Sequence, residues 1–168
     1  MDTDEWVIHT PNIRATKFWP GSMGLMANYA IVFARAVVGE NDYGVSPFMV
    51  QLRSQEDHSL MSGVTCGDLG TKLGYNAIDN GFLSFDQYRI PRVDMLSRFS
   101  SIDIEGNFVL NGDPRVLYSI MVTTRMNISR GCGLKIMNCL LIAARYAVCR
   151  RQFKTMPGNK EERKLIDY

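Results

Sequence analysis

Histidine is scarce in this sequence, and the usual patterns of metal and hydrolytic sites are missing. Only two histidines occur, His9 and His58, and none of the four cysteines belongs to a C-x-x-C pair. A structural zinc site needs several such ligands at close spacing. A catalytic Ser/His/Asp or Cys/His set needs a histidine beside a nucleophile. We therefore expect no metal site and no hydrolase triad in this chain.

An excess of charge of one sign is also missing. The chain has 19 Lys and Arg against 17 Asp and Glu, a net charge of +2. That is too little for a nucleic-acid-binding surface or a polybasic membrane anchor. No apolar run approaches the roughly 18 residues of a membrane span, and Asp2, Asp4 and Glu5 stand where a secretory signal would be basic. The sequence predicts no nucleic-acid partner and no membrane span.

Cysteine is sparse and irregularly spaced. Three of the four cysteines, Cys132, Cys139 and Cys149, fall within one expected helical region, and Cys66 stands apart. Spacing of this kind does not suggest a disulfide framework. We expect reduced, mostly packed thiols in an intracellular protein.

The first 110 residues have the pattern of a β domain. Short apolar and β-branched runs alternate with turns rich in Gly and Asn. Strands are expected at 6–8, 28–38, 47–53, 62–66 and 82–90, with turns at 41–44 and 79–81. The run 28–38 is also long enough for a helix. Several such strands favour an antiparallel β-sandwich or barrel.

The pattern becomes helical near residue 112. Asp113 is placed to cap a helix, and Pro114 suits its first position. Apolar residues then recur every three or four positions as far as Val148, and the helix should end near 156–158. Gly131 and Gly133 would each weaken a lone helix by about 1 kcal/mol, which makes sense if another helix or a ligand comes close. The expected fold class is α+β: a β domain at 1–110, followed at 111–168 by the first long helices of an α-helical bundle domain.

One stretch, residues 17–24, combines a basic residue, two aromatic rings, a proline and two glycines. Pro20 fixes its own φ and lacks a backbone donor, whereas Gly21 and Gly24 allow close approach to the backbone. Phe18 and Trp19 can wall an apolar slot. Such a segment can hold a flat aromatic ligand against bare main chain. From these residues alone, a tight turn with a core tryptophan is the alternative.

The same stretch resembles the flavin-side loop of the acyl-CoA oxidases, within the acyl-CoA dehydrogenase superfamily. Further blocks resemble the family in family order, at 3–11, 72–75, 79–83, 89–92 and 150–153. The resemblance runs nearly end to end, yet it covers only the middle of such an enzyme.

The resemblance implies a definite chemistry. In this superfamily a β domain sits between two helical domains, and FAD lies between the β domain and the C-terminal helices, often reaching a neighbouring subunit. A glutamate removes the α-proton of a fatty acyl-CoA while the β-hydride passes to the flavin. Oxidases return the electrons to O₂ and form H₂O₂. Implied partners are therefore acyl-CoA, O₂ and, in the full-length protein, a second subunit. The implied compartment is the peroxisome, with the mitochondrion as the alternative.

Cofactor-binding residues implied by the resemblance include Trp19, Pro20 and Gly21. Trp19 matches the tryptophan beside the flavin ring. Gly21 matches a position that is Thr or Ser in dehydrogenases, where the hydroxyl bonds the flavin. We hypothesise that glycine there leaves room for O₂. A glycine needed only for its φ is the alternative.

Other implied site residues lie in the helical part. Arg150 matches an arginine that approaches the FAD pyrophosphate, commonly that of the partner subunit, and Gln152 accompanies it. A guanidinium suits phosphate because its planar fork donates two bonds at once; a merely solvated arginine is the alternative. Thr124 and Arg125 match a pair near the acyl-CoA. Thr124 cannot act as the base, so the resemblance implies a base beyond Tyr168.

The match begins after the family's N-terminal helical domain, its flavin-binding Thr-Glu segment and the first strands of the β domain. We therefore expect these 168 residues alone to have little or no oxidase activity. A truncated product, a piece of a longer enzyme and a degenerate homologue kept as a structural or assembly subunit remain open. Acyl-chain length cannot be read, because the residues that set tunnel depth lie mostly outside this segment.

Overall fold

A computed structural model describes residues 3–113, 115–154, 157–158 and 160–168. The chain divides into two units, Met1–Asp113 and Pro114–Tyr168. Pro114 and Met156, which the sequence placed at the start and end of the helix, lie outside the described residues.

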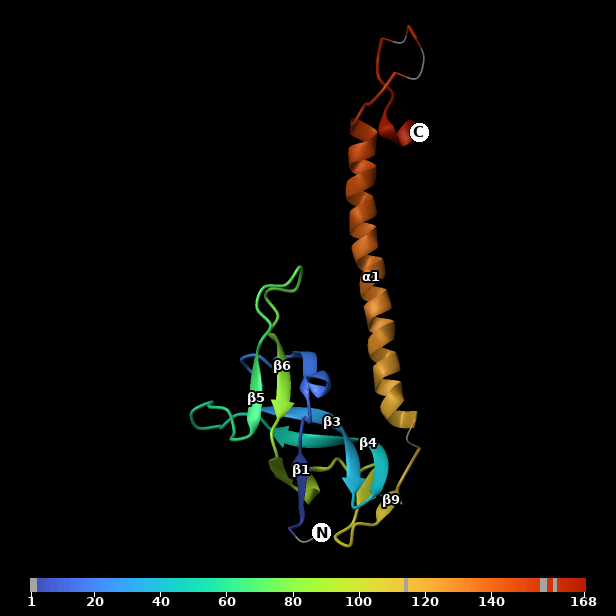
Figure 1. The fold of residues 1–168 in the computed structure, drawn as a ribbon. Helices are drawn as coiled ribbons and strands as arrows, with labels where there is room; N and C mark the ends of the chain where they lie inside the picture. The colour runs from blue at the N-terminus through green and yellow to red at the C-terminus, as the bar shows by residue number, and fades with distance from the viewer. Residues whose placement is uncertain (1–2, 114, 155–156, 159) are drawn as a thin grey trace. The chain divides into compact units, whose positions relative to one another are not determined.

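Unit 1 is built from short antiparallel strands (Figure 1). In chain order its elements are β1 (Glu5–Ile8), the 3₁₀ turn η1 (Ile13–Ala15), β2 (Lys17–Gly21), β3 (Tyr29–Val38), β4 (Asn41–Gln51), β5 (Val64–Asp68), β6 (Asn80–Phe85), β7 (Tyr88–Pro91), the 3₁₀ turn η2 (Arg92–Asp94), β8 (Ser100–Ile102) and β9 (Phe108–Leu110). Among the described residues the sheets have the orders β1-β7, β2-β6-β5, β3-β4 and β8-β9. The expected α+β class with antiparallel strands is confirmed.

The longest hairpin joins β3 to β4. Residues 28–38 are thus a strand rather than a helix over nearly their whole length. Val38 pairs with Asn41, which leaves Gly39 and Glu40 as the turn. Gly39 has a φ of +60°, a conformation that glycine adopts without strain. The turn expected at 41–44 was therefore wrong, because those residues already belong to β4.

The strand expected at 82–90 is two strands. β6 ends at Phe85, where it is still paired with β5. Gln87 then has a φ of +48°, which breaks the extended chain. β7 begins at Tyr88 and pairs with β1 instead. This change of pairing partner explains why apolar and polar residues alternate imperfectly across the segment.

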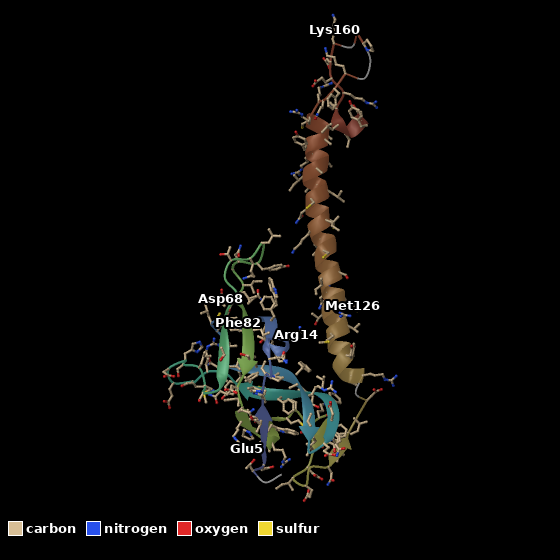
Figure 2. The ribbon with its side chains drawn as sticks, in the orientation of Figure 1. Glu5, Arg14, Asp68, Phe82, Met126 and Lys160 are labelled. Carbon is tan, nitrogen blue, oxygen red and sulfur yellow. The ribbon has the colours of Figure 1, made fainter. Side chains whose placement is uncertain are left out.

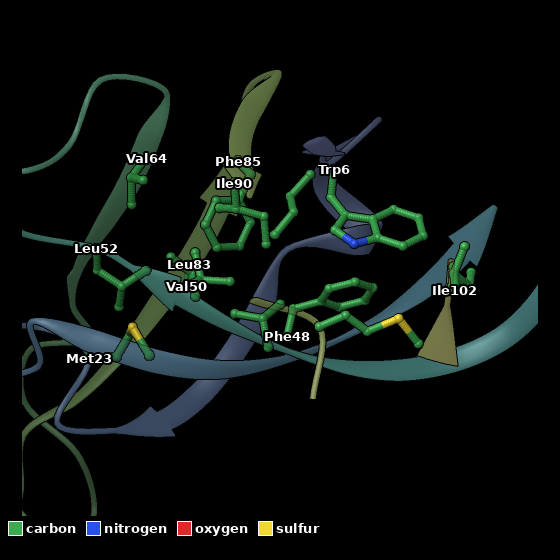
Figure 3. Packing of buried hydrophobic residues seen from close by; sticks show 14 residues of the cluster. Trp6, Met23, Phe48, Val50, Leu52, Val64, Leu83, Phe85, Ile90 and Ile102 are labelled. Carbon is green, nitrogen blue, oxygen red and sulfur yellow. The ribbon is translucent and has the colours of Figure 1, made fainter. Parts of the chain in front are cut away.

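The core of unit 1 lies where these sheets face one another (Figure 3). Its buried apolar residues are Trp6, Ile8, Met23, Val32, Ala36, Phe48, Val50, Leu52, Val64, Leu83, Phe85, Ile90, Met95 and Ile102. The Trp6 and Phe48 rings meet edge to face, with centroids 5.4 Å apart. Full burial of one such side chain contributes about 1.5–3 kcal/mol. Strands from four sheets are therefore held on a single core.

Unit 2 consists of the helix α1 (Arg115–Cys149) and a short return of the chain that ends in the 3₁₀ turn η3 (Leu165–Asp167). The helix end expected near 156–158 was wrong. After Cys149 the chain leaves the helix, and Arg151 forms an antiparallel bridge with Lys164. The extended hairpin takes over the backbone hydrogen bonds that a longer helix would have made.

Apolar side chains project from α1 into solvent along its length, Met126 among them (Figure 2). By length and composition alone, Met121–Cys149 could cross a membrane. The sequence expectation counted unbroken apolar runs and missed this stretch, because the scattered Arg and Lys residues interrupt every run. Core helices of soluble proteins meet the same criterion, so the finding by itself does not favour a membrane.

All four cysteines are free. Cys66 is half-buried, but Cys132, Cys139 and Cys149 are exposed on α1. The expectation of mostly packed thiols was wrong for these three, because the described residues of unit 2 leave them exposed. Gly131 and Gly133 are similar: an added Cβ at either would meet nothing within 4 Å.

Candidate functional site

Trp19 and Pro20 form an irregularity in β2. Phe18 pairs with Phe82, but the next pair is Gly21 with Asn80, so the register shifts between them. Pro20 cannot donate to the ladder, which explains why the strand is interrupted there. Trp19 has a φ of +76°, a region that a bulky aromatic residue rarely adopts. Such strain persists where surrounding contacts hold it, and it often accompanies function.

The two rings of this segment are exposed rather than packed in the core. Trp19 is 48% and Phe18 66% exposed, and the rings stand edge to face with centroids 6.3 Å apart. The alternative of a core tryptophan was therefore wrong; Trp6 fills that role instead. Adjacent exposed rings on a strand edge form an apolar surface that a flat ligand or another protein segment can cover.

Gly21 differs from its neighbour Gly24 in what surrounds it. An added Cβ at Gly21 would meet nothing within 4 Å, and its φ is not positive. Neither backbone conformation nor crowding within this chain therefore requires glycine at this position. At Gly24 an added Cβ would lie 2.8 Å from the Asp68 Cα, and at Gly81 it would lie 2.6 Å from the Gly24 nitrogen. Gly24 and Gly81 serve packing, whereas Gly21 leaves an open stretch of main chain.

The loop that follows, residues 22–27, is held from one side by Arg53. The residue is only 5% exposed. Its guanidinium donates hydrogen bonds to the carbonyl oxygens of Gly24 (2.9 Å), Met23 (3.2 Å) and Ala27 (2.7 Å). A further bond of 3.1 Å reaches the Cys66 sulfur. Burial raises the pKa of the Cys66 thiol, although the nearby guanidinium opposes that rise. Cys66 is thus kept a neutral thiol.

Asp79 holds the same loop by its amides. One carboxylate oxygen accepts hydrogen bonds from the backbone N–H groups of Leu25 and Met26, each at 3.0 Å. Burial would raise the pKa of Asp79. Hydrogen bonds from these two amides and that of Gly24, together with the charge of Arg53, outweigh burial and hold the pKa below its ordinary value. The neighbouring Asn80 side chain donates to the Trp19 carbonyl at 3.3 Å. Residues at the beginning of β6 thus contact both loop 22–27 and the strained Trp19.

In unit 2 the expected site residues Arg150 and Gln152 lie just beyond α1. The Arg150 amide donates to Tyr146, and the Arg150 carbonyl accepts from Leu165 at 2.9 Å. The Gln152 carbonyl accepts from the Tyr168 hydroxyl, also at 2.9 Å. The hairpin therefore fixes the main chain here and leaves the Arg150 side chain exposed. A cation at a helix C-terminus is also favoured by the helix dipole.

Thr124 and Arg125 are exposed near the beginning of α1. Twenty-five residues separate Arg125 from Arg150, which is about 37 Å along a helix at its usual rise. The two arginines therefore cannot hold the same small group. Within unit 1, by contrast, Trp19, Pro20 and Gly21 are consecutive residues of β2.

Comparisons with known proteins identify the family of this chain. A family model described as acyl-CoA oxidase, C-alpha1 domain, matches residues 118–168. The peroxisomal acyl-coenzyme A oxidase 1 of Arabidopsis thaliana is 46% identical over 170 residues, covering 99% of this chain and 26% of the relative. The chain belongs to the acyl-CoA oxidase family.

Solved acyl-CoA oxidases share the fold. The tomato enzyme, from Lycopersicon esculentum, superposes with a TM-score of 0.88 at 45% identity over 99% of this chain and 26% of its own. Acyl-CoA oxidase-2 of Caenorhabditis elegans, solved with FAD, ascaroside-CoA and ATP, gives a TM-score of 0.86 at 40% identity, over 99% of this chain and 25% of its own. The chain thus spans about a quarter of the length of these relatives.

Sequence reasoning missed the residues that shape the loop. Arg53 was counted as the end of a strand, and Asp79 as part of a turn signal. An arginine directly after the apolar Leu52, just beyond β4, was the available hint, because buried charges need several partners. Among the residues that the structure describes, no cluster of three or more His, Cys, Asp or Glu side chains could hold a metal ion.

Proposed function

We propose that these residues form part of an FAD-dependent acyl-CoA oxidase that introduces an α,β double bond into fatty acyl-CoA and passes the electrons to O₂, giving H₂O₂. The observation that carries the proposal is the uncrowded backbone of Gly21 beside the half-exposed Trp19, in a chain that belongs to this family. The family relatives named as peroxisomal support the peroxisome as its compartment.

The segment from Trp19 to Gly21 fits one face of a flavin ring. Trp19 supplies an aromatic wall, Pro20 offers no donor that must be satisfied, and Gly21 exposes main chain without a side chain. FAD, when bound, accepts the hydride and returns electrons to O₂. The chain's own part is to orient the ring and keep one edge of it uncrowded.

The open space at Gly21 supports our hypothesis that oxygen reaches the flavin there. The alternative, that glycine is needed for its φ, loses support because this φ is not positive. In a full-length relative, the threonine substitution at the position equivalent to Gly21 should slow reoxidation of the reduced flavin by O₂, while the alanine substitution should slow it less. Stopped-flow flavin absorbance measures both. Equal rates for all three proteins would contradict the hypothesis.

Arg150 and Gln152 are proposed to bind the FAD pyrophosphate, and Thr124 and Arg125 to line the acyl-CoA site. Arg125 lies on α1 and Arg150 just beyond its end. Their separation, about 37 Å at the usual helical rise, supports two different binding sites. It agrees with the proposal that Arg150 serves the flavin of a partner subunit in a homodimer. We propose that the catalytic base belongs to a part of the oxidase beyond Tyr168, because Thr124 carries no carboxylate.

A chimera tests the proposed function. The corresponding quarter of the Arabidopsis peroxisomal oxidase is replaced by these 168 residues, and FAD content and acyl-CoA-dependent H₂O₂ are measured. We expect the chimera to bind FAD and form peroxide, and a Trp19→Ala version to lose most of both. The 168-residue chain alone should do neither.

A structural or assembly subunit is the second candidate. The exposed apolar residues along α1 favour it, since such a helix face needs a covering partner. A chimera that folds and assembles, yet binds no FAD and forms no peroxide, would favour this second function over the first.

A further inference from the structure

Loop 22–27 has its backbone hydrogen bonds supplied largely by side chains from other segments. Arg53 donates to three of its carbonyl oxygens, and Asp79 accepts from two of its amides. The His58 ring nitrogen lies 2.6 Å from the Leu25 carbonyl oxygen. A loop fixed on both its donor and acceptor sides has little freedom to adopt a second conformation.

Holding a loop with a buried arginine requires a large desolvation free energy to be offset. Removing a guanidinium from water is costly unless its donors are satisfied. Arg53 meets this requirement with three carbonyl oxygens and the Cys66 sulfur. Its planar fork reaches Gly24 and Ala27 at once, which the single ammonium of a lysine cannot reproduce. The geometry therefore uses a property specific to arginine.

The held loop is continuous with the proposed flavin segment. The Ser22 amide donates to the Asp79 carbonyl, and the Asn80 side chain donates to the Trp19 carbonyl at 3.3 Å. Trp19 occupies a strained φ that its neighbours must maintain. Because Ser22 is bonded directly to Gly21, greater mobility of loop 22–27 would also change the backbone conformation of Gly21.

We propose that Arg53 and Asp79 are positioning residues, which fix loop 22–27 and thereby hold Trp19 and Gly21 in the conformation that receives the flavin ring. The proposal rests on the proposed function for its ligand, but not for the loop itself. Arg53 and Asp79 touch loop atoms rather than the cofactor, so they act only through the segment that they hold.

Amide hydrogen exchange on the 168-residue chain, read by NMR, tests the positioning. The variants are Arg53→Lys, Arg53→Met and Asp79→Asn, and the matched control is Arg35→Met, which removes an exposed arginine on β3. We expect exchange at Leu25 and Met26 to rise about tenfold or more in the Arg53 and Asp79 variants, relative to the core amide of Val50. The exchange rate of these two amides relative to Val50 should be intermediate in Arg53→Lys, between wild type and Arg53→Met. The control should leave this ratio unchanged.

Two results overturn the proposal. One is an equal rise at Leu25, Met26 and Val50 in every variant, which would mean that Arg53 and Asp79 only stabilise the unit. The other is no change at Leu25 and Met26. If Arg53→Met does not fold, Arg53→Lys and Asp79→Asn decide, since each keeps a polar group at the site.

FAD titration of the chimera separates this proposal from the proposed function. Arg53→Lys should raise the FAD dissociation constant about tenfold, whereas Arg35→Met should not. A loosened loop with unchanged FAD affinity would overturn the positioning role. A wild-type chimera that binds no FAD would overturn the proposed function, and the exchange ratio would then decide the role of Arg53 and Asp79 in holding the loop.

Discussion

The two units satisfy their side chains in opposite ways. In its described residues, unit 1 buries fourteen apolar side chains in a shared core, and charged side chains hold loop 22–27. In unit 2, α1 leaves apolar residues such as Leu141 and Met137 more than half exposed. The difference teaches that unit 1 has its own source of stability. The helix carries apolar surface that is exposed in the part of the chain that the structure describes.

The largest expected effect is the contrast between a core truncation in unit 1 and a truncation on the helix. Phe48→Ala should reduce the free energy of unfolding by about 3–5 kcal/mol. Leu141→Ala, at an exposed position, should change it by no more than about 0.5 kcal/mol. Urea denaturation followed by circular dichroism measures both. A large loss for Leu141→Ala would show that α1 is packed in solution, and the contrast would fail.

A second contrast lies within unit 1, between two glycines. An added Cβ at Gly81 would lie 2.5 Å from the Gly67 carbonyl oxygen, so Gly81→Ala should destabilise the unit by about 1–3 kcal/mol. Gly21→Ala meets open space and should be neutral or stabilise by up to about 1 kcal/mol, because alanine has less freedom in the unfolded chain. Thermal unfolding compares the two. Similar melting temperatures would contradict the packing argument.

Trp19→Asn should sharpen the distinction between stability and function. Asparagine tolerates the φ of +76° found at Trp19 better than an aromatic residue does. We expect the free energy of unfolding to stay constant or rise by about 1 kcal/mol, while the chimera loses FAD affinity. Calorimetry gives the first quantity and flavin titration the second. A clear loss of stability would indicate that the ring supports the fold.

The smallest expected effect is a dependence on pH. Because the pKa of Asp79 is lower in the folded chain than its ordinary value, its contribution to stability is complete above about pH 4 and is lost as the pH falls through the folded pKa. Asp79→Asn should therefore narrow the drop in melting temperature between neutral and acid pH. Subtracting the drop in melting temperature of the variant from that of the wild type cancels the contribution of the other carboxylates. An identical drop in both would exclude this role.

The sequence was informative where local pattern decides the structure. The order of strands before helix could be predicted from neighbouring residues, and the family from a resemblance spread over several blocks. The residues of the ring-and-glycine segment alone left a core tryptophan open, and only the structure shows that Trp19 is exposed. The break at Gln87 and the end of α1 at Cys149 could not be predicted from neighbouring residues, because pairing with distant segments decides them. β7 pairs with β1, and Arg151 forms a bridge with Lys164. The role of Arg53 also depends on carbonyl groups 26 to 30 positions earlier in the chain.

The exposed thiols of α1 have a practical consequence. Cys132 and Cys139 are seven residues apart, two helical turns, so they lie on one face of α1. When the helix is bare, a maleimide reagent reaches them freely. Once other segments close over that face, the same reagent is shut out. The extent of maleimide labelling at these two cysteines would therefore report how much of this helix face is covered.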